Sequence, residues 1–460
     1  MNDYKGKRLV ILGAARQGLA LAKYLSAHGA LVTVTDQKDA KVLQDVISDF
    51  QENEINWVLG GHPIELLNET DYLSLSGGVP LTVPLVQEAL NRNITLTNDS
   101  QIFLELVRCP VIGITGSAGK TTTTLLVGKM AAFALSEPHS WIGGNIGNPL
   151  ISDVDQMEED HIAVMELSSF QLEQMSISPW IACITNITPN HLDRHGTMEA
   201  YTYAKAKILA AQSESDIAVL NRDDKGSWAL RGDVRGQLIS FGRQKPEIGQ
   251  VGTYLEEDWI CYWDGKESSK LVPLDSIKLR GAHNQMNVLA ACAIAAAAEF
   301  PAEAMLEGVK ALDGVPHRLE FVREWGGAAW VNDSKATAPK GSIAALNSFH
   351  EPLVLLAGGR DKKLPWEDFS RLVLKRVKHL ILFGEAAEKI EKALAAELDP
   401  GQEMIPYRKY SGLEEAIKAA AEVCEEGDVV LLSPGGTSFD EFVDFEERGE
   451  KFRLWVNELN

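Results

Sequence analysis

Residues 113–122, Gly-Ile-Thr-Gly-Ser-Ala-Gly-Lys-Thr-Thr, constrain the fold of this chain more than any other segment. An apolar run at 111–114 precedes the glycines, and an apolar helical pattern at 125–131 follows them. A strand, a glycine turn and a helix N-terminus in this order aim backbone N–H groups at a phosphate, and the helix dipole assists. The segment therefore predicts an α/β domain with a phosphate-binding loop.

The loop departs from the strict Walker pattern. Ile114 stands where the first glycine belongs, so that only Gly116-x-x-Gly119-Lys120-Thr121 remains. A glycine-rich turn between a strand and a helix can be purely structural. The Lys-Thr pair favours phosphate binding, because the lysine reaches the outer phosphates of a nucleotide and the hydroxyl is a ligand of Mg²⁺. We therefore expect the chain to use ATP.

Length and composition set further limits. A chain of 460 residues is long enough for about three domains. Its formal net charge of −21 argues against a nucleic-acid partner, whose phosphates would be repelled. The five cysteines lie far apart and show no metal-binding or redox spacing, which predicts isolated buried thiols in a reducing cytosol.

The N-terminus resembles an export signal only briefly. Lys5, Lys7 and Arg8 precede an apolar run, but Arg16 interrupts that run and a glycine turn occupies its centre. The longest apolar helix candidate, 288–298, is too short to span a bilayer. We expect a cytoplasmic protein with no membrane partner.

Three α/β blocks follow one another, each beginning with a strand and a glycine-rich turn. In the first, the pattern predicts a buried strand at 8–12, a glycine turn at 13–18, a helix at 19–28 and a second strand at 31–35 that ends at Asp36. This order is typical of a Rossmann-like βαβ unit.

The second and third blocks repeat the alternation of strands and helices. The second block opens with the phosphate loop and ends with a helix that starts near residue 283. The third reads as a further doubly wound sheet. The predicted strands of these two blocks are 162–165, 181–184, 217–220, 329–331, 353–357, 380–383 and 429–432.

Turn-rich segments place the domain boundaries. Asn98-Asp-Ser100 predicts a linker, and Asp313-Gly-Val-Pro-His317 predicts a connector. The expected fold class is α/β with three consecutive domains. They are a Rossmann-like domain at 1–98, a central P-loop-type mononucleotide-binding domain at 99–313, and a Rossmann-like C-terminal domain at 314–460.

Polar groups that follow the central strands are candidates for chemistry. Glu166 ends a strand near the phosphate loop, where a carboxylate can hold Mg²⁺ or simply cap a helix. His191 lies in a polar loop after the next strand and can be a metal ligand, a general base or neither. Lys205 lies on the following helix, where solvent-facing lysines are the ordinary expectation.

Three further polar loops follow strands of the third block. One such loop can be structural, but three at strand ends of one sheet favour a substrate site. Arg318, Lys335 and Lys362 add positive charge there, which favours an anionic substrate. The loops are 330–337, 355–362 and 432–440.

Five motifs, taken together, resemble one protein family. They are Thr115-Gly-x-x-Gly-Lys-Thr121, Glu166-Leu-Ser-Ser-Phe-Gln171, Asn190-His-Leu-Asp-Arg194, His283-Asn-x-x-Asn287 and Asn332-Asp-Ser-Lys-Ala-Thr337. Their combination resembles the Mur ligases, which are ATP-dependent amide ligases that build the peptidoglycan stem peptide. Residues 332–337 and 433–442 resemble the D-glutamate-adding members in particular. The resemblance spans all three blocks in the same order.

The resemblance implies a ligand for each domain, namely a UDP-sugar in the first, ATP in the second and the acceptor amino acid in the third. It places UDP-N-acetylmuramoyl-L-alanine near Gly13, Arg16, Gln17, Gly18, Asp36, Gly77, Gly78, Asn145, Ser168 and His191. It places ATP near Gly116, Ser117, Ala118, Gly119, Lys120, Thr121, Thr122, Asn284, Asn287, Arg318, Asp333 and Lys335. It places D-glutamate near Thr337, Lys362, Ser438, Phe439 and Phe445.

The resemblance also implies two Mg²⁺ sites. One would be held by Thr121 and Glu166, and the other by His191 and a carbamylated Lys205. Carbamylation would turn an ammonium group that repels Mg²⁺ into an anionic oxygen ligand. Two loops depart from the family pattern: Ala118 stands where the family often has Asn, and the turn at 76–78 lacks the usual Pro.

The activity implied is a two-step ligation in peptidoglycan precursor synthesis. The muramoyl-alanine carboxylate attacks the γ-phosphate of ATP, and the D-glutamate amine then attacks the acyl phosphate. Lys120 and Lys205 are expected to be catalytic, and His191, His317 and Asp333 are unranked candidates for the proton acceptor. The expected partners are these small molecules alone, with the protein a monomer.

Two alternative functions fit parts of the sequence. A folylpolyglutamate-synthetase-like ligase shares the central domain and its chemistry but should lack the N-terminal βαβ unit. A dinucleotide-binding oxidoreductase or nucleotide sensor would use 13–18, but Ala15 replaces the middle glycine that lets a pyrophosphate approach. The phosphate loop also counts against this second alternative.

Overall fold

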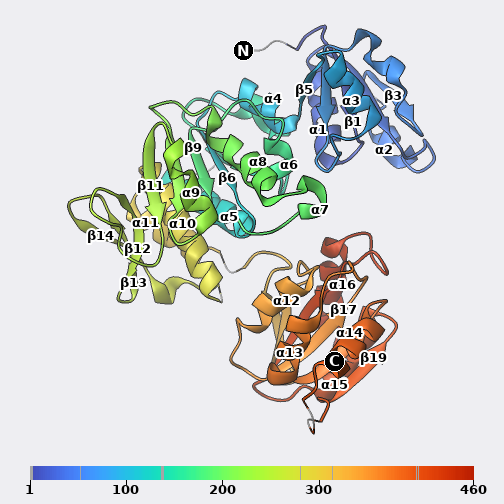
Figure 1. Cartoon of the computed structure of the whole chain (residues 1–460), viewed down its shortest axis with the longest axis vertical. Helices are drawn as coiled ribbons and strands as arrows, with labels where there is room; N and C mark the ends of the chain where they lie inside the picture. Colours follow the sequence, from blue (N-terminus) through green and yellow to red (C-terminus); the bar gives the residue numbers. More distant parts are fainter. Residues whose placement is uncertain are drawn as a thin grey trace. The chain divides into compact units, whose positions relative to one another are not determined.

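The structure is a computed structural model that describes residues 4–51, 53–135, 139–279, 281–312, 314–399, 401 and 403–459 (Figure 1). The chain forms two compact units. The first comprises Met1–Ile277 with His283–Ala311, and the second comprises Lys278–Ala282 with Leu312–Asn460. The expected α/β class is confirmed, with a wholly or mainly parallel sheet in each of the three blocks.

The first sheet consists of parallel strands in the order β3-β2-β1-β4-β5, drawn in blue in Figure 1. Side chains of β1 alternate between two cores, with Leu9 and Ile11 facing the helix after β1 and Val10 facing Leu85 and Val86. Its elements are β1 (Arg8–Leu12), α1 (Arg16–Ala27), β2 (Leu31–Asp36), α2 (Gln44–Asp49), β3 (Ile55–Leu59), the 3₁₀ helix η1 (Ile64–Glu69), β4 (Tyr72–Leu75), α3 (Pro84–Asn91) and β5 (Thr95–Thr97).

Two predictions for the first block are wrong in detail. The helix after β1 begins at Arg16 rather than at residue 19, so Gly18 lies in its first turn. The predicted linker at 98–100 is the start of α4 (Asp99–Leu106), with buried Asn98 as its N-cap. The Asn98 side chain accepts a hydrogen bond from Gln101 N at 2.8 Å, because this residue type satisfies the unpaired donors of a helix start.

The central sheet has the order β14-β13-β12-β11-β10-β9-β6-β8-β7 and is parallel from β7 to β12. β8 and β9 are buried along their whole length, as continuous apolar strands of parallel sheets are. Its strands are β6 (Val111–Thr115), β7 (Ser140–Gly144), β8 (Ile162–Glu166), β9 (Ile181–Ile184), β10 (Ile217–Asn221), β11 (Gln237–Phe241), β12 (Val251–Glu256), β13 (Trp259–Trp263) and β14 (Ser268–Pro273).

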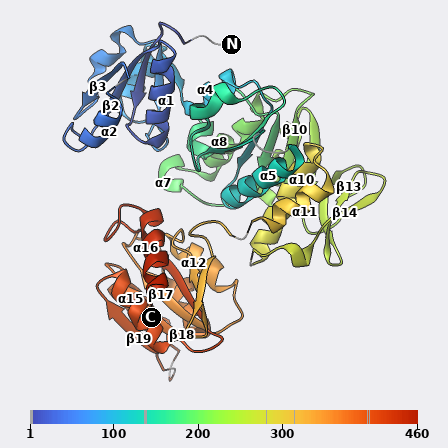
Figure 2. The ribbon, with the colours of Figure 1, turned by 180° about the vertical axis from the view of Figure 1, so that it is seen from behind.

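Helices alternate with the strands of this sheet from β6 to β11 along the chain, and α5 directly follows the phosphate loop. The helix after the phosphate loop, α5, packs against α11, and Figure 2 shows the two side by side. The helices are α5 (Lys120–Leu135), η2 (Leu150–Gln156), α6 (Ser169–Leu172), α7 (Leu192–His195), α8 (Met198–Ala210), α9 (Lys225–Ala229), η3 (Leu230–Asp233), η4 (Leu274–Ser276), α10 (Ala282–Ala297) and α11 (Ala302–Lys310).

The second unit contains the third sheet, in the order β15-β16-β20-β17-β18-β19, parallel except for the β15–β16 pair. Asp313, in the predicted connector, lies outside the described residues. The elements are β15 (Glu320–Trp325), β16 (Ala328–Asn332), α12 (Pro339–Leu346), β17 (Leu353–Gly358), α13 (Glu367–Arg376), β18 (Val377–Phe383), α14 (Ala387–Ala396), β19 (Tyr407–Tyr410), α15 (Leu413–Val423), β20 (Val429–Gly435) and α16 (Phe445–Asn457).

Two composition-based expectations can be compared with the structure. All five cysteines are free thiols, and four of them are buried, as expected; Cys424 is half-buried. In the part of the chain that the structure describes, no helix combines the length and apolar character needed to cross a bilayer.

The contact between α5 and α11 positions the phosphate loop, because α5 begins at Lys120. Gly308 of α11 lies so close to α5 that an added Cβ would be 2.7 Å from the backbone nitrogen of Met130. We expect Gly308→Ala to lower the thermal unfolding midpoint by several degrees, since overpacking costs about 1–3 kcal/mol. Differential scanning calorimetry checks this, with exposed Gly232→Ala, which meets no atom within 4 Å, as the matched control. Equal midpoints for the two variants would contradict the packing argument.

Candidate active site

The two glycines of the phosphate loop are required by close contacts. Gly116 has φ 149° and Gly119 has φ 85°, conformations that favour glycine. A Cβ at Gly116 would lie 1.9 Å from Thr185 Oγ1, and one at Gly119 would lie 2.3 Å from Asn287 Oδ1. A side chain at either position would therefore displace Thr185 or Asn287, so the loop can keep this conformation only with glycine at both positions.

The loop after β9 holds the phosphate loop in shape. Thr185 Oγ1 donates to Ala118 O at 2.7 Å, and Asn186 both accepts from Ala118 N and donates to Ala118 O, each at 2.9 Å. Ser117 Oγ donates to Thr188 O at 2.9 Å. The roles of Thr185 and Asn186 were not anticipated, although both lie in the polar loop that the sequence analysis marked.

Glu166 joins three segments at the ends of the central strands. Its carboxylate accepts from Thr121 Oγ1 at 2.8 Å and from Asn145 Nδ2 at 2.9 Å. Its side chain is buried. Lys120, which precedes Thr121, donates from Nζ to Gly116 O at 3.0 Å. Glu166 thus contacts both Thr121, its predicted partner at a Mg²⁺ site, and Asn145, which is predicted to lie near the UDP-sugar.

Lys205 is buried against the phosphate loop, so the ordinary expectation of a solvent-facing lysine is wrong. It is 1% exposed, and Nζ donates to Gly116 O at 2.8 Å and to Thr115 Oγ1 at 3.2 Å. Burial, together with the positive charge of Lys120, lowers the pKa of Lys205 well below its usual value. Burial of the amine therefore favours its neutral form over the ammonium.

The donor set suits a nucleotide with Mg²⁺. A threonine hydroxyl and a carboxylate in contact are oxygen ligands, which this hard cation prefers. The described residues contain no cluster of three or more His, Cys, Asp or Glu side chains that could hold a metal ion. Of the four predicted metal ligands, only Glu166 and His191 are of those types. The fit of a cation therefore rests on the Thr121–Glu166 contact.

His191 and His195 lie at the two ends of the short helix α7 but differ in environment. His191 is exposed, with a left-handed backbone of φ 51°, and its ring meets the edge of Phe170 at 5.2 Å. His195 is buried: its Nδ1 lies 3.0 Å from Glu173 Oε1, and its Nε2 lies 3.0 Å from Ser169 Oγ. Burial lowers the pKa of His195, against the charge of Glu173. No sequence pattern distinguishes His195 from an ordinary histidine.

Of the residues predicted for the UDP-sugar, those of the first block lie at the C-terminal ends of β1, β2 and β4, whereas Asn145, Ser168 and His191 lie in the central block. Asp36 Oδ2 accepts from Ala14 N at 2.8 Å, and Ser76 Oγ donates to Gly13 O at 2.7 Å. Gly18 is packed so tightly that a Cβ would lie 2.3 Å from Ser76 Oγ. The strand order places this cluster at the edge where open α/β sheets bind ligands.

The first and central sheets meet beside Asn145 within the first unit. Gln17 Nε2 donates to Gly144 O, and Arg16 Nη2 donates to Asn145 O, both at 3.4 Å. Ser168 is the N-cap of α6, and its hydroxyl donates to Gln171 Oε1 at 2.8 Å. The glycine turn of the first sheet is thus brought next to the residue that contacts Glu166.

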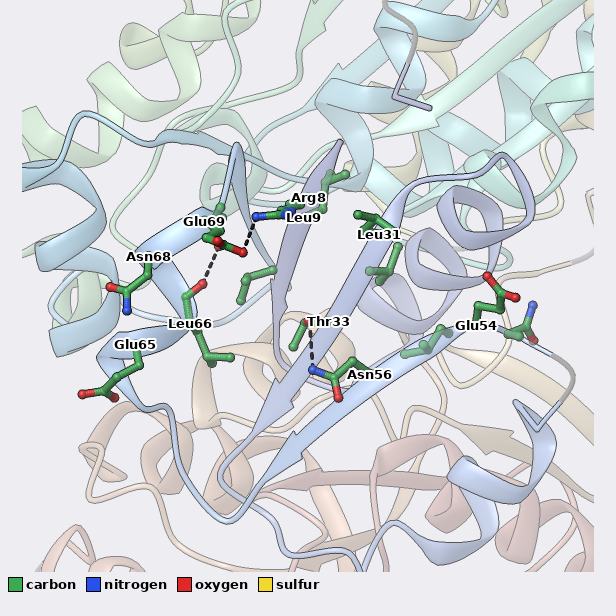
Figure 3. A pocket seen from close by; sticks show the side chains of 15 residues that line it. Arg8, Leu9, Leu31, Thr33, Glu54, Asn56, Glu65, Leu66, Asn68 and Glu69 are labelled. Atoms are coloured by element: carbon green, nitrogen blue, oxygen red, sulfur yellow. Dashed lines mark hydrogen bonds and ion pairs between the residues drawn. The ribbon is translucent and has the colours of Figure 1, made fainter. Parts of the chain in front are cut away.

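A cavity of about 960 Å³ in the first sheet lies away from all of these residues (Figure 3). It is lined by the N-terminal halves of β1, β2 and β3 and by η1, and Asn56 Nδ2 donates to Thr33 Oγ1 within it at 3.3 Å. None of the predicted site residues lines it.

In the second unit, Asp333 lies in a buried polar cluster. Ser433 Oγ donates to its carboxylate at 2.7 Å, and Leu319 N donates at 3.3 Å. Burial raises the pKa of Asp333 to about 7, against that hydrogen bond from Ser433 and the charge of Arg318. His317 is buried too, with its Nδ1 3.2 Å from Asn332 Nδ2, and burial lowers its pKa.

The residues predicted for D-glutamate lie at strand ends of the third sheet. Lys362 Nζ donates to Thr337 Oγ1 at 3.3 Å, which joins the loops after β17 and β16. Ser438 is buried, Phe439 is exposed, and the ring of Phe445 lies 6.2 Å from that of His317. A backbone bridge between Arg360 and Thr437 joins the loop after β17 to the loop after β20.

Comparison with known protein families gives matches in all three blocks. Residues 7–98 match the Mur ligase MurD-like N-terminal domain, 114–295 the Mur ligase middle domain, and 317–436 the Mur ligase glutamate ligase domain. The first match covers the βαβ unit that a folylpolyglutamate-synthetase-like ligase was expected to lack.

Curated relatives match along the whole chain. The UDP-N-acetylmuramoylalanine–D-glutamate ligase of Symbiobacterium thermophilum is 40% identical over 454 residues, covering 99% of this chain and 98% of that protein. The protein of the same name from Clostridioides difficile is 38% identical over 460 residues, covering 99% of this chain and 100% of that protein.

Solved structures share the fold at lower identity. The UDP-N-acetylmuramate-alanine ligase of Thermotoga maritima has a TM-score of 0.62 at 18% identity, covering 98% of this chain and 99% of that chain. A pseudomurein peptide ligase type C from Methanothermus fervidus has a TM-score of 0.56 at 18% identity, covering 99% of this chain and 100% of that chain. Since the relatives at up to 40% identity span nearly the full length and the family matches fall in every block, the chain belongs to the Mur ligase family.

Proposed function

We propose that this chain joins the carboxylate of UDP-N-acetylmuramoyl-L-alanine to the amino group of D-glutamate, using ATP, in peptidoglycan precursor synthesis. The relatives that carry the name of this ligase support the substrates, because their similarity extends over the whole chain. The observation that best supports this ATP-dependent chemistry is the hydrogen bond between Thr121 and Glu166, where the phosphate loop meets α5.

The first step is phosphoryl transfer. The backbone of 116–119 and the N-terminus of α5 hold the phosphates of ATP, and Lys120 exchanges its bond to Gly116 O for the γ-phosphate. A muramoyl-alanine carboxylate oxygen attacks the γ-phosphorus, the bond to the β-phosphate oxygen breaks, and ADP leaves with that electron pair. Lys120 stabilises the charge on the transferring group, which is the main way in which proteins promote this reaction.

Thr121 and Glu166 would hold Mg²⁺ beside these phosphates. When bound, the cation neutralises the charge of the β- and γ-phosphate oxygens. Asn145 keeps the Glu166 carboxylate in place through its hydrogen bond at 2.9 Å. We propose contacts with ATP for Asn284, Asn287, Arg318, Asp333 and Lys335 as well.

We propose that Lys205 reacts with CO₂ to form a carbamate. A neutral amine is the reactive form, and the lowered pKa of Lys205 supplies it. The lone pair of Nζ attacks the carbon of CO₂, and a C–N bond forms while one C–O π bond opens and its electron pair passes to the oxygen. The nitrogen then releases one proton to water, which leaves an anionic carbamate. The resulting oxygens, together with His191, would be ligands of a second Mg²⁺.

The second step forms the amide. The D-glutamate amine attacks the acyl carbon, and phosphate leaves when the tetrahedral intermediate collapses. His191, His317 and Asp333 are the candidate proton acceptors, and a pKa of about 7 allows Asp333 to exchange a proton near neutral pH. Lys362 and Thr337 offer a cation and a hydroxyl to a substrate carboxylate.

The proposed substrates predict a selective assay. Phosphate release from ATP is measured with UDP-N-acetylmuramoyl-L-alanine and, in turn, D-glutamate, L-glutamate, L-lysine and diaminopimelate. We expect release with D-glutamate only, because Lys362 and Thr337 are proposed to select the acceptor through a substrate carboxylate. Preference for L-lysine or diaminopimelate would overturn the proposed acceptor. Lys120→Ala serves as the control for adventitious ATPase and should lower kcat by about a hundredfold or more.

The carbamate predicts a second outcome. Lys205→Ala should lower kcat about a hundredfold, and acetate or bicarbonate should restore part of the activity by supplying a carboxylate. Lys207→Ala is the matched control on the same helix; that lysine donates to the backbone carbonyl of Glu173 and should be dispensable for kcat. ¹³C NMR with labelled bicarbonate should detect a carbamate in the native protein that is absent from Lys205→Ala. Full activity of Lys205→Ala without any additive would refute the carbamate.

A further inference from the structure

The side chain of Arg194 joins two segments that are far apart in the sequence. Its Nη1 donates to Gly78 O at 2.8 Å, and its Nη2 donates to Val79 O at 2.6 Å. Arg194 follows the loop that carries His191, whereas Gly78 follows β4 of the first sheet. Two charge-assisted bonds from one planar fork fix both the distance and the orientation of the two segments.

The guanidinium is also held from the side of α6. Its Cζ lies 4.3 Å from the centre of the Phe170 ring, and Nη2 lies 4.0 Å from Glu173 Oε2. The side chain is 16% exposed, so water competes little for these partners. Phe170 and Glu173 of the central block therefore fix the orientation in which the Arg194 side chain meets Gly78 and Val79.

His195 anchors the backbone that carries Arg194. Its ring stacks on Phe170 with 5.3 Å between centres and an angle of 7° between planes. Its Nδ1 pairs with the Glu173 carboxylate, and its Nε2 is hydrogen-bonded to the Ser169 hydroxyl. The short helix α7 is thus fastened to α6, and the position of the Arg194 side chain follows from that attachment.

The turn that Arg194 holds packs on the glycine turn after β1. Ser76 donates to Gly13 O, and a Cβ at Gly77 would lie 2.7 Å from Gln17 Oε1. Without Arg194 the carbonyls of Gly78 and Val79 would lose these two charged donors, and the turn would be free to shift against Gln17. Preorganisation of a loop contributes to affinity because the cost of ordering it is met before the ligand binds.

We propose that Arg194 is a positioning residue that presents the turn 76–79 to the UDP-sugar substrate and so sets the affinity for that substrate. The inference rests on the proposed function. It assigns to Arg194 no contact with ATP, D-glutamate or the reacting atoms, so its effect is confined to one of the three substrates.

Arg194→Gln tests this role by steady-state kinetics with each substrate varied in turn. We expect KM for UDP-N-acetylmuramoyl-L-alanine to rise about tenfold, while KM for ATP and D-glutamate and kcat change less than about threefold. Arg194→Lys keeps the charge but not the fork and should give an intermediate rise of about threefold. If Arg194→Gln does not fold, Arg194→Lys decides the question by the same comparison of KM values.

Arg231→Gln is the matched control. This exposed arginine also lies over an aromatic ring, that of Trp228 at 5.5 Å, and donates to a backbone carbonyl at 2.9 Å, but far from the turn 76–79 in sequence. It should leave all three KM values unchanged. An equal rise of all three KM values in the Arg194 variants, or an unchanged KM for the UDP-sugar, would overturn the proposal.

A binding measurement separates this proposal from the proposed function. Isothermal titration calorimetry with UDP-N-acetylmuramoyl-L-alanine alone should show the same loss of affinity in Arg194→Gln, without any need for turnover. Failure of the native protein to ligate D-glutamate would contradict the proposed function. Ligation by the native protein with equal UDP-sugar affinity in both forms would contradict the role of Arg194 alone.

Discussion

A buried carboxylate organises the catalytic half of this molecule. Glu166 is buried at the end of β8, and it accepts hydrogen bonds from Thr121 at the start of α5 and from Asn145 after β7. A buried carboxylate is costly unless its oxygens are satisfied, so the two donors and the strand that carries the acid must arrive together. The phosphate loop, the turn after β7 and the end of β8 are thereby held in one arrangement.

Other features of the first unit depend on this arrangement. The phosphate loop leaves no room for side chains at Gly116 and Gly119, and buried Lys205 donates a hydrogen bond to its Gly116 carbonyl. The backbone carbonyl of Asn145 accepts a hydrogen bond from Arg16, at the start of α1 in the first block. A nucleotide site and the glycine turn assigned to the UDP-sugar are thus linked by consecutive polar contacts within the first unit.

The sequence predicted the parts of this fold that depend on local patterns. β8, β9 and β10 were placed to within one residue, because buried parallel strands are continuous apolar runs. The predicted linker at 98–100 is wrong because Asn and Ser occur in helix caps and in loops alike, and the structure has the start of α4 there. The residue pattern alone predicted a solvent-facing Lys205, and only the family resemblance pointed to a role for it. Its contact with Gly116 and the reach of Arg194 were not predicted, because both follow from packing between segments distant in sequence. The D-glutamate contacts remain predictions.

The central claim is that Glu166 and Thr121 hold the cation that accompanies the nucleotide. ADP affinity, measured by calorimetry with and without Mg²⁺ for the native protein and for Glu166→Gln, tests it most directly. We predict that Mg²⁺ strengthens ADP binding about tenfold in the native protein and less than about threefold in Glu166→Gln, with unchanged affinity in the absence of metal. Equal strengthening by Mg²⁺ in both proteins would contradict the account.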